Sequence, residues 1–166
     1  YGFIETLRAS AVFAASKEVL TWARTQYDNV ELGIVHQSAS IIEGIMSEQE
    51  QYNKNSLYLY IDRFKLHIIA VKDTELQYYN QFSIKQFSDY IKYIMLVMKG
   101  LGYNQKTSNV VLWGYIGKQS PHYDEFYKYI KNISFGNRPG FLNFDYNFDA
   151  VQDHHYFDLY SSYLCE

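Results

Sequence analysis

The pattern of apolar and polar positions in the middle of the chain predicts three short, closely spaced strands. Residues 57–61 are almost wholly apolar, which is typical of a central strand that is covered on both faces. Residues 64–71 form a second strand directly afterwards. In the third strand, Leu76, Tyr78, Asn80 and Phe82 alternate with Glu75, Gln77, Tyr79 and Gln81. This period of two predicts an edge strand, and the three strands together predict an antiparallel meander.

Helices and strands are predicted to alternate after the meander. Apolar residues recur at helical spacing from Phe87 to Leu101, and Gly102 ends this helix. Residues 109–113 predict another apolar strand. Ser120 and Pro121 then begin a second helix, because proline lacks an amide that a helix start leaves unpaired anyway. A short strand over residues 133–135, a loop over 136–140 and a closing helix over 156–164 follow.

The segment up to residue 50 predicts a smaller β-α-β-α unit with parallel strands. Residues 11–15 predict a short buried strand, and Ser16 is placed to cap the helix that follows. Residues 30–35 predict the second strand. Ser40 and Glu43 have the spacing of a capping box for a helix with an apolar stripe, formed by Ile41, Ile42, Ile45 and Met46. The polar residues 49–56 mark the boundary to the second half.

The order β-β-β-α-β-α-β-α from residue 57 onward is that of the ribonuclease H-like α/β fold, with a mixed sheet. The preceding β-α-β-α unit fits the end of another such lobe, and two lobes in tandem make the actin-like arrangement. We assign residues 1–50 to the C-terminal part of a first actin-like lobe and residues 57–166 to a second ribonuclease H-like lobe. Because the first unit is too small to bury both faces of a parallel sheet, we expect the native chain to extend upstream of Tyr1.

Composition and charge narrow the classes of function. The 166 residues are 48% apolar and 20% charged, as expected of a globular chain. The net charge of −3 argues against nucleic acid as a partner, because Lys and Arg neutralise phosphate in such complexes. The 18 tyrosines and 11 phenylalanines would suit a stacking surface for single strands only beside a basic groove, which is missing, so codon bias explains them better.

Two further features of the sequence bear on where in the cell the protein lies. No apolar stretch is long enough to span a bilayer, so we predict no membrane segment. The lone Cys165 cannot form an internal disulfide, which favours a reducing cellular compartment as the location of the chain. We therefore expect a cytoplasmic protein.

The second half resembles a bacterial family of unknown function, known mainly from the Bacteroidetes, whose members have an actin-like ATPase fold. The resemblance rests on Leu-Tyr-Leu-Tyr-Ile-Asp at 57–62, on Val-Val-Leu-Trp-Gly-Tyr-Ile-Gly-Lys-Gln-Ser-Pro at 110–121, and on the final run 156–166, which ends in Leu-Cys-Glu. More remotely, the layout is similar to the second lobe of actin-type pilus-assembly and division proteins. The family has no established activity, so the resemblance implies a fold and assigns no catalytic residue.

Two strand ends are the candidate positions for nucleotide chemistry. Actin-like ATPases place an aspartate at the end of the first strand, followed by a glycine that lets the backbone approach phosphate. Here Asp62 is the catalytic candidate, but Arg63 replaces that glycine and the bulky Phe64 follows. Arg63 is a phosphate contact only through its guanidinium. The paired glycines of the adenosine-binding turn are here Gly114 and Gly117, which two bulky residues separate. Both turns are better explained as structural, and we predict no cofactor.

A ribonuclease H-like nuclease would instead gather carboxylates around two metal ions. The available aspartates are Asp62, Asp89, Asp149 and Asp153. No partner carboxylate follows Asp62 on the next strand, which counts against this chemistry. His154 and His155 are adjacent, so their side chains point in different directions, and no His/Cys spacing supports a metal site. We predict no bound metal.

The preserved fold pattern and the altered phosphate loops favour one functional hypothesis. The chain is interpreted as a degenerate actin-like module that binds a protein partner, or a second copy of itself, without catalysis. The alternatives are a nucleotide-binding ATPase of the actin/sugar kinase superfamily and, less favoured, a metal-dependent nuclease.

Overall fold

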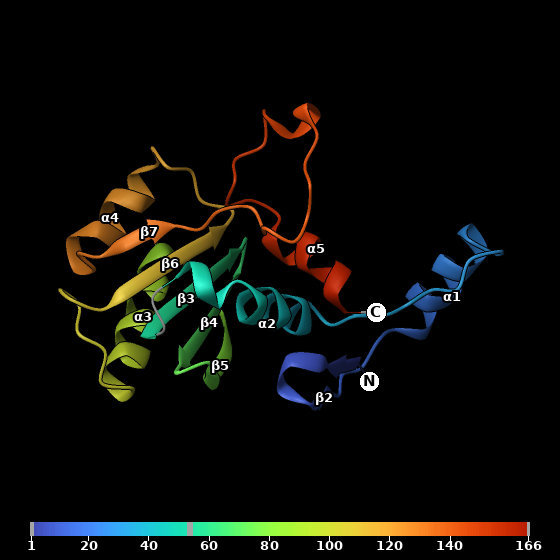
Figure 1. The fold of residues 1–166 in the computed structure, drawn as a ribbon, viewed down its shortest axis with the longest axis horizontal. Helices are drawn as coiled ribbons and strands as arrows, with labels where there is room; N and C mark the ends of the chain where they lie inside the picture. The colour runs from blue at the N-terminus through green and yellow to red at the C-terminus, as the bar shows by residue number, and fades with distance from the viewer. Residues whose placement is uncertain (1, 53–54, 166) are drawn as a thin grey trace.

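A five-stranded mixed sheet forms the centre of the computed structural model, which describes residues 2–52 and 55–165 (Figure 1). The strand order is β5-β4-β3-β6-β7. The strands are β3 (Asn55–Asp62), β4 (Lys65–Lys72), β5 (Glu75–Ser83), β6 (Asn109–Gly114) and β7 (Ile133–Phe135). β3, β4 and β5 are antiparallel, and β6 and β7 join β3 in parallel. The predicted meander, the central position of β3 and the edge position of β5 are all confirmed.

Two helices cover one face of this sheet. They are α3 (Phe87–Gly100) and α4 (Pro121–Tyr129). Leu57, Leu59 and Ile61 of β3 are buried in the same apolar cluster as Ile94 of α3 and Phe126 of α4. The Ser120 hydroxyl caps α4 by accepting the Tyr123 amide, as the sequence predicts. Residues that alternate along β3 therefore face two different layers.

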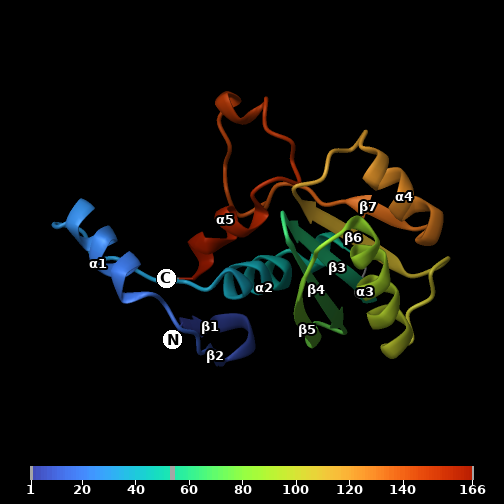
Figure 2. The same ribbon diagram turned by 180° about the vertical axis from the view of Figure 1, so that it is seen from behind.

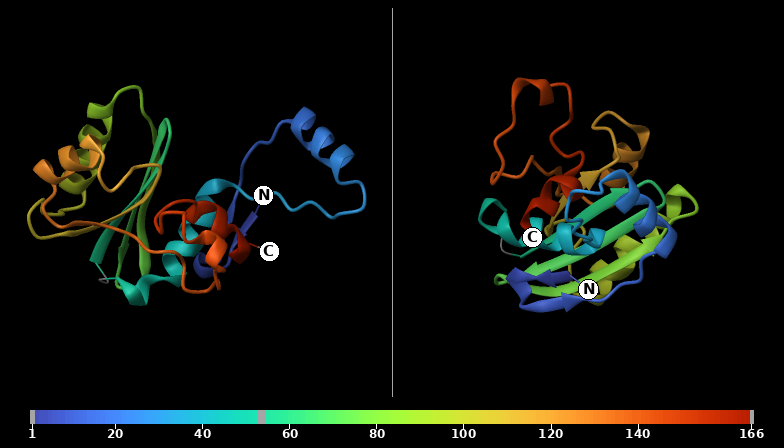
Figure 3. Two further views of the ribbon diagram at one scale, coloured as in Figure 1. Left: turned by 90° about the horizontal axis from the view of Figure 1, so that it is seen from above. Right: turned by 90° about the vertical axis from the view of Figure 1, so that its right-hand side faces the viewer.

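The opposite face is covered by α2 (Gln37–Ser47) and α5 (Phe157–Ser161), as Figure 3 shows with the sheet seen edge-on. Tyr58 and Tyr60 of β3 pack there with Ile41, Ile45 and Phe157. Three short 3-10 helices lie nearby, namely η2 (Gln49–Gln51), η3 (Tyr146–Phe148) and η4 (Ser162–Leu164). The predicted closing helix corresponds to α5 and η4 and is confirmed.

The N-terminal part differs from the predicted parallel β-α-β-α unit. β1 (Gly2–Ile4) and β2 (Ala9–Ala11) form an antiparallel hairpin around the 3-10 helix η1 (Glu5–Leu7). The predicted strands over 11–15 and 30–35 are wrong. Of these residues only Ala11 lies in a strand, at the end of β2, and Val12 is 86% exposed. The helix after Ser16 is confirmed as α1 (Lys17–Gln26), with the Ser16 hydroxyl accepting the Val19 amide.

The start of α2 also differs from the prediction. The helix begins at Gln37, and the His36 side chain caps it by accepting the Ser38 amide. Ser40 and Glu43 are therefore interior and buried, and the predicted capping box is wrong. Glu43 instead accepts the Thr6 amide at 3.2 Å, which joins α2 to the N-terminal hairpin. The apolar stripe that was predicted for this helix is confirmed. The assignment of residues 1–50 to a first lobe stays a prediction.

Residues 12–35, here called the arm, project from the rest of the chain. α1 stands apart from the sheet and its helices in opposite views (Figures 1 and 2). No residue of the arm is buried, although many of its side chains are large and apolar. Over the ranges that the structure describes, no helix has the length and apolar character needed to cross a membrane.

Candidate functional site

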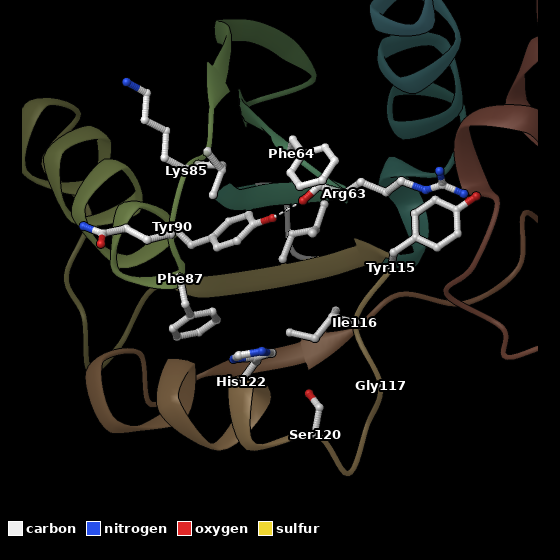
Figure 4. Close-up of a pocket in the computed structure, with 13 residues that line it drawn as sticks. Arg63, Phe64, Lys85, Phe87, Tyr90, Tyr115, Ile116, Gly117, Ser120 and His122 are labelled. Atoms are coloured by element: carbon white, nitrogen blue, oxygen red, sulfur yellow. Dashed lines mark hydrogen bonds between the residues drawn. The ribbon is translucent and has the colours of Figure 1, made fainter.

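A pocket of about 400 Å³ opens where the parallel strands β3 and β6 end (Figure 4). Its walls are largely apolar, with Ile84, Tyr90 and Ile116 among them, and all three are buried. Arg63 and Gly117, two of the residues singled out from the sequence, also line it. Ligands of open α/β sheets bind beyond the carboxyl ends of the strands, so this pocket is the candidate site of the chain.

The turn after β3 is held by the segment that leads into α3. Register pairs Asp62 with Lys65, so Arg63 and Phe64 alone make the turn, and Arg63 has a φ of 38°. The Tyr90 hydroxyl donates to the Arg63 carbonyl oxygen at 2.8 Å, which Figure 4 marks with a dashed line. The Ile84 amide donates to the Phe64 carbonyl oxygen at 2.7 Å. The Phe64 ring remains 76% exposed at the edge of the pocket.

Asp62, the catalytic candidate, lies apart from this pocket because consecutive residues of a strand face opposite sides. Its carboxylate accepts from the Gln37 amide nitrogen at 3.2 Å, and the same nitrogen donates to Asp158 at 2.8 Å. The Tyr60 hydroxyl also donates to Asp158. Burial and the nearby Asp158 carboxylate raise the pKa of Tyr60. Asp62 thus belongs to a contact between β3, α2 and α5.

The turn after β6 uses its own amides for internal hydrogen bonds. The Gly114 amide donates to the His154 carbonyl oxygen, and the Tyr115 amide donates to the Ile61 carbonyl oxygen, both at 2.8 Å. The Ile116 amide donates to the Gly114 carbonyl oxygen at 2.9 Å. Backbone recognition of a phosphate group relies on free amides that converge on it. Three successive amides at this strand end therefore already donate hydrogen bonds within the protein. Gly114 is part of the turn itself.

Two buried histidines stand close to these strand ends. Burial lowers the pKa of His67 to about 4, and its Nδ1 lies 2.9 Å from the Tyr79 hydroxyl. Burial likewise lowers the pKa of His154 to about 4, and its Nε2 lies 2.6 Å from the Ile116 carbonyl oxygen. Both imidazoles are neutral at physiological pH. His154 thus ties the last loop to the pocket turn.

The four carboxylates considered for a nuclease do not gather at one place. Asp149 and Asp153 line a pocket together, and neither Asp62 nor Asp89 lines it. Asp89 caps α3, accepting the amides of Lys85 and Gln86 at 3.0 and 3.1 Å, and these bonds lower its pKa. Asp153 lies 3.2 Å from Arg138 in an ion pair. Within residues 2–52 and 55–165, no group of three His, Cys, Asp or Glu residues is arranged to hold a metal ion.

Several site residues were missed from the sequence. Lys85 and Tyr90 line the pocket with Arg63, yet they lie beyond the meander in the chain. Gln37 and Asp158 are 121 positions apart, so no local spacing relates them. For these residues the sequence offers one signal, which is the position of Lys85 just before the start of α3. Helix starts that follow strand ends commonly border ligand sites.

The fold is similar to a solved structure of a Bacteroides thetaiotaomicron protein with an actin-like ATPase fold and unknown function. The two chains are 21% identical, with a TM-score of 0.68 over 92% of this chain and 52% of that one. The likeness confirms the predicted actin-like fold, and this chain spans about half the length of that protein. None of the curated proteins matches significantly. A family model described as "Protein of unknown function (DUF3822)" matches residues 1–133, and the chain belongs to that family.

Proposed function

We propose that the chain is a non-catalytic actin-like module that binds another protein through the arm. The observation that carries the proposal is the exposure of large apolar side chains along the arm, in which no residue is buried. Val19, Trp22 and Val30 are 59%, 62% and 61% exposed. Contiguous exposed apolar surface commonly marks a protein interface, and tryptophan is enriched at the centres of such interfaces.

The turns after β3 and β6 support the proposal that the module is not catalytic. The amides after β6 donate internally, and Phe64 occupies the turn where phosphate would need close backbone approach. Asp62 is engaged by Gln37 on the other face of the sheet. A net charge of −3 disfavours nucleic acid as the partner. The single Cys165 is consistent with a cytoplasmic location.

A photo-crosslinking experiment tests the arm. Benzoylphenylalanine placed at Tyr27 in the full-length protein is expected to form one discrete adduct in the native host. Val19→Glu and Trp22→Glu should each abolish that adduct, whereas the polar, exposed Thr21→Glu should retain it. Sedimentation velocity of the purified protein shows whether the partner is a second copy. An adduct that survives both apolar-to-Glu changes would refute the proposal.

Nucleotide binding is the second candidate, and the cationic and aromatic side chains of the pocket are the observation behind it. The pocket carries two cationic residues, Arg63 and Lys85, together with the aromatic rings of Phe87 and Tyr115. A thermal-shift panel with ATP, GTP and Mg²⁺ separates the two candidates. A ligand at a hundredfold excess over its Kd stabilises a protein by about 2.7 kcal/mol. No shift is expected for a module that only binds protein.

A further inference from the structure

We propose that the pocket at the ends of β3 and β6 binds an acidic peptide segment of a partner protein. One apolar side chain of the segment enters the pocket, and acidic residues on both sides of it contact Arg63 and Lys85. This site is distinct from the arm, and it does not depend on what the arm binds.

The interior of the pocket fits an apolar side chain. Ile84, Tyr90 and Ile116 give it a buried apolar floor, and the Phe87 ring stacks on His122 with centroids 4.4 Å apart. The Tyr90 hydroxyl already donates to the Arg63 carbonyl oxygen, so Tyr90 presents only its apolar ring to a ligand. An apolar group that leaves water for such a surface gains free energy in proportion to its buried area.

The edge of the pocket presents side chains that are unusual for a tight turn. Turns favour Gly, Asn, Asp and Ser, yet the two turn residues here are Arg63 and Phe64. Phe64 is 76% exposed, and Arg63 holds a left-handed φ of 38°, which is unfavourable for a bulky residue. The bonds from Tyr90 and Ile84 hold this turn in place. An apolar ring displayed on a fixed turn is suited to contact a partner.

The charges at the pocket favour an anionic ligand that extends across it. Neither Arg63 nor Lys85 has a carboxylate within ion-pair distance among the described residues, although the chain carries a net charge of −3. Figure 4 shows their side chains leaving the pocket in opposite directions. The guanidinium carbon of Arg63 lies 5.9 Å from the centroid of the Tyr115 ring. An extended peptide advances about 3.3 Å per residue and places residues on both sides of an anchor, which suits two cations that point in opposite directions.

A nucleotide suits this arrangement less well. Its negative charge is concentrated in one phosphate chain, which is commonly held by converging backbone amides. The amides of Gly114, Tyr115 and Ile116 already donate within the protein. The carboxylates of an acidic peptide need only the two side chains, and the Arg63 guanidinium can donate two hydrogen bonds to one carboxylate.

Fluorescence anisotropy with labelled peptides tests the proposal. The probes are Asp-Glu-Xaa-Glu-Asp peptides in which Xaa is Trp, Leu or Ser, together with Lys-Lys-Trp-Lys-Lys. The Trp and Leu probes are expected to bind at least about tenfold more tightly than the Ser probe, given the free energy of burying a large apolar side chain. Binding should weaken with added NaCl. The basic probe should not bind.

Matched variants locate the binding. Arg63→Gln, Lys85→Gln and Phe64→Ser change exposed side chains, so the fold should persist, and each is expected to weaken the Trp probe about three- to tenfold. Lys92→Gln removes an exposed cation of α3 that does not line the pocket, and it should change nothing. Trp22→Glu on the arm should also leave the affinity unchanged. The proposal would be overturned if no probe binds, or if the Trp and Ser probes bind equally. It would also be overturned if Arg63→Gln and Lys85→Gln leave the affinity unchanged, or if ATP displaces the Trp probe.

Discussion

Gly114 lies so close to Ile61 that a Cβ atom on the glycine would overlap the Ile61 carbonyl oxygen. The glycine also has a φ of +104°, which side chains rarely adopt. We therefore expect Gly114→Ala to lower the free energy of unfolding by about 2 kcal/mol or more. Urea denaturation measures the change. Gly33→Ala is the control, because nothing lies within 4 Å of a Cβ there. Equal midpoints for the two variants would contradict this account of the turn.

A second glycine sets the distance between α2 and α5. A Cβ on Gly44 would overlap the Ser161 hydroxyl and lie 2.9 Å from Cε1 of Phe157. Gly44→Ala is expected to cost about 1–3 kcal/mol, despite the higher helix propensity of alanine. The Ser161 hydroxyl has no hydrogen-bond partner among the described residues, so Ser161→Gly should partly rescue Gly44→Ala. Strictly additive effects in a double-mutant cycle would show that the two helices do not meet there.

The stability of the protein should fall as the pH is lowered through the range in which histidines titrate. Burial lowers the pKa of His67 from 6.5 to about 4, so between these values the unfolded chain binds more protons than the folded chain. Stability from this group is complete above pH 6.5 and is lost as the pH falls towards 4. His67→Gln should flatten the dependence of the urea midpoint on pH over this range.

The control for this effect is His122→Gln, which changes an exposed imidazole. It should leave the pH dependence close to that of the unchanged protein. His154 has the same shift, to about 4, so His67→Gln is expected to remove only part of the slope. A slope that is the same in the unchanged protein and in His67→Gln would show that His67 is accessible to protons in the folded state.

The second half of the fold was predictable because its local signals agree with its packing. The apolar run of β3, the alternation of β5 and the Ser120-Pro121 helix start each specify an element that the sheet or its helices then bury. The arm lacks that agreement. Residues 30–35 have the apolar character of a strand, but no strand among the described residues pairs with them. Local pattern alone does not make a strand.

The candidate site was predictable only in part, for geometric reasons. The sequence led correctly to the ends of β3 and β6, where Arg63 and Gly117 line one pocket. It placed Asp62 with them, but alternation along the strand turns that carboxylate towards Gln37 on the other face. The partner carboxylate, Asp158, comes from a helix far along the chain. Contacts of this kind are set by tertiary packing, which no sequence spacing encodes.

We predict that the full-length protein does not hydrolyse ATP and has no measurable affinity for it. Phosphate recognition in actin-like folds relies on backbone amides at turns after two strands. Arg63 and Phe64 form the turn after β3. In the turn after β6, the amides of Gly114 and Tyr115 donate to acceptors within the protein. Arg63 can still offer a guanidinium, but it cannot restore the space that Phe64 takes.

Isothermal titration calorimetry with ATP and Mg²⁺ is the decisive measurement. We expect no binding heat from the unchanged protein or from Asp62→Ala, because the Asp62 carboxylate accepts the Gln37 amide rather than facing the pocket. Asp62→Asn is the matched control, since it keeps the size of the side chain and removes its charge. A micromolar Kd that is lost in both variants would mean that Asp62 binds a nucleotide-bound metal. The contact with Gln37 would then have to open on binding, and the chain would be a working nucleotide-binding protein.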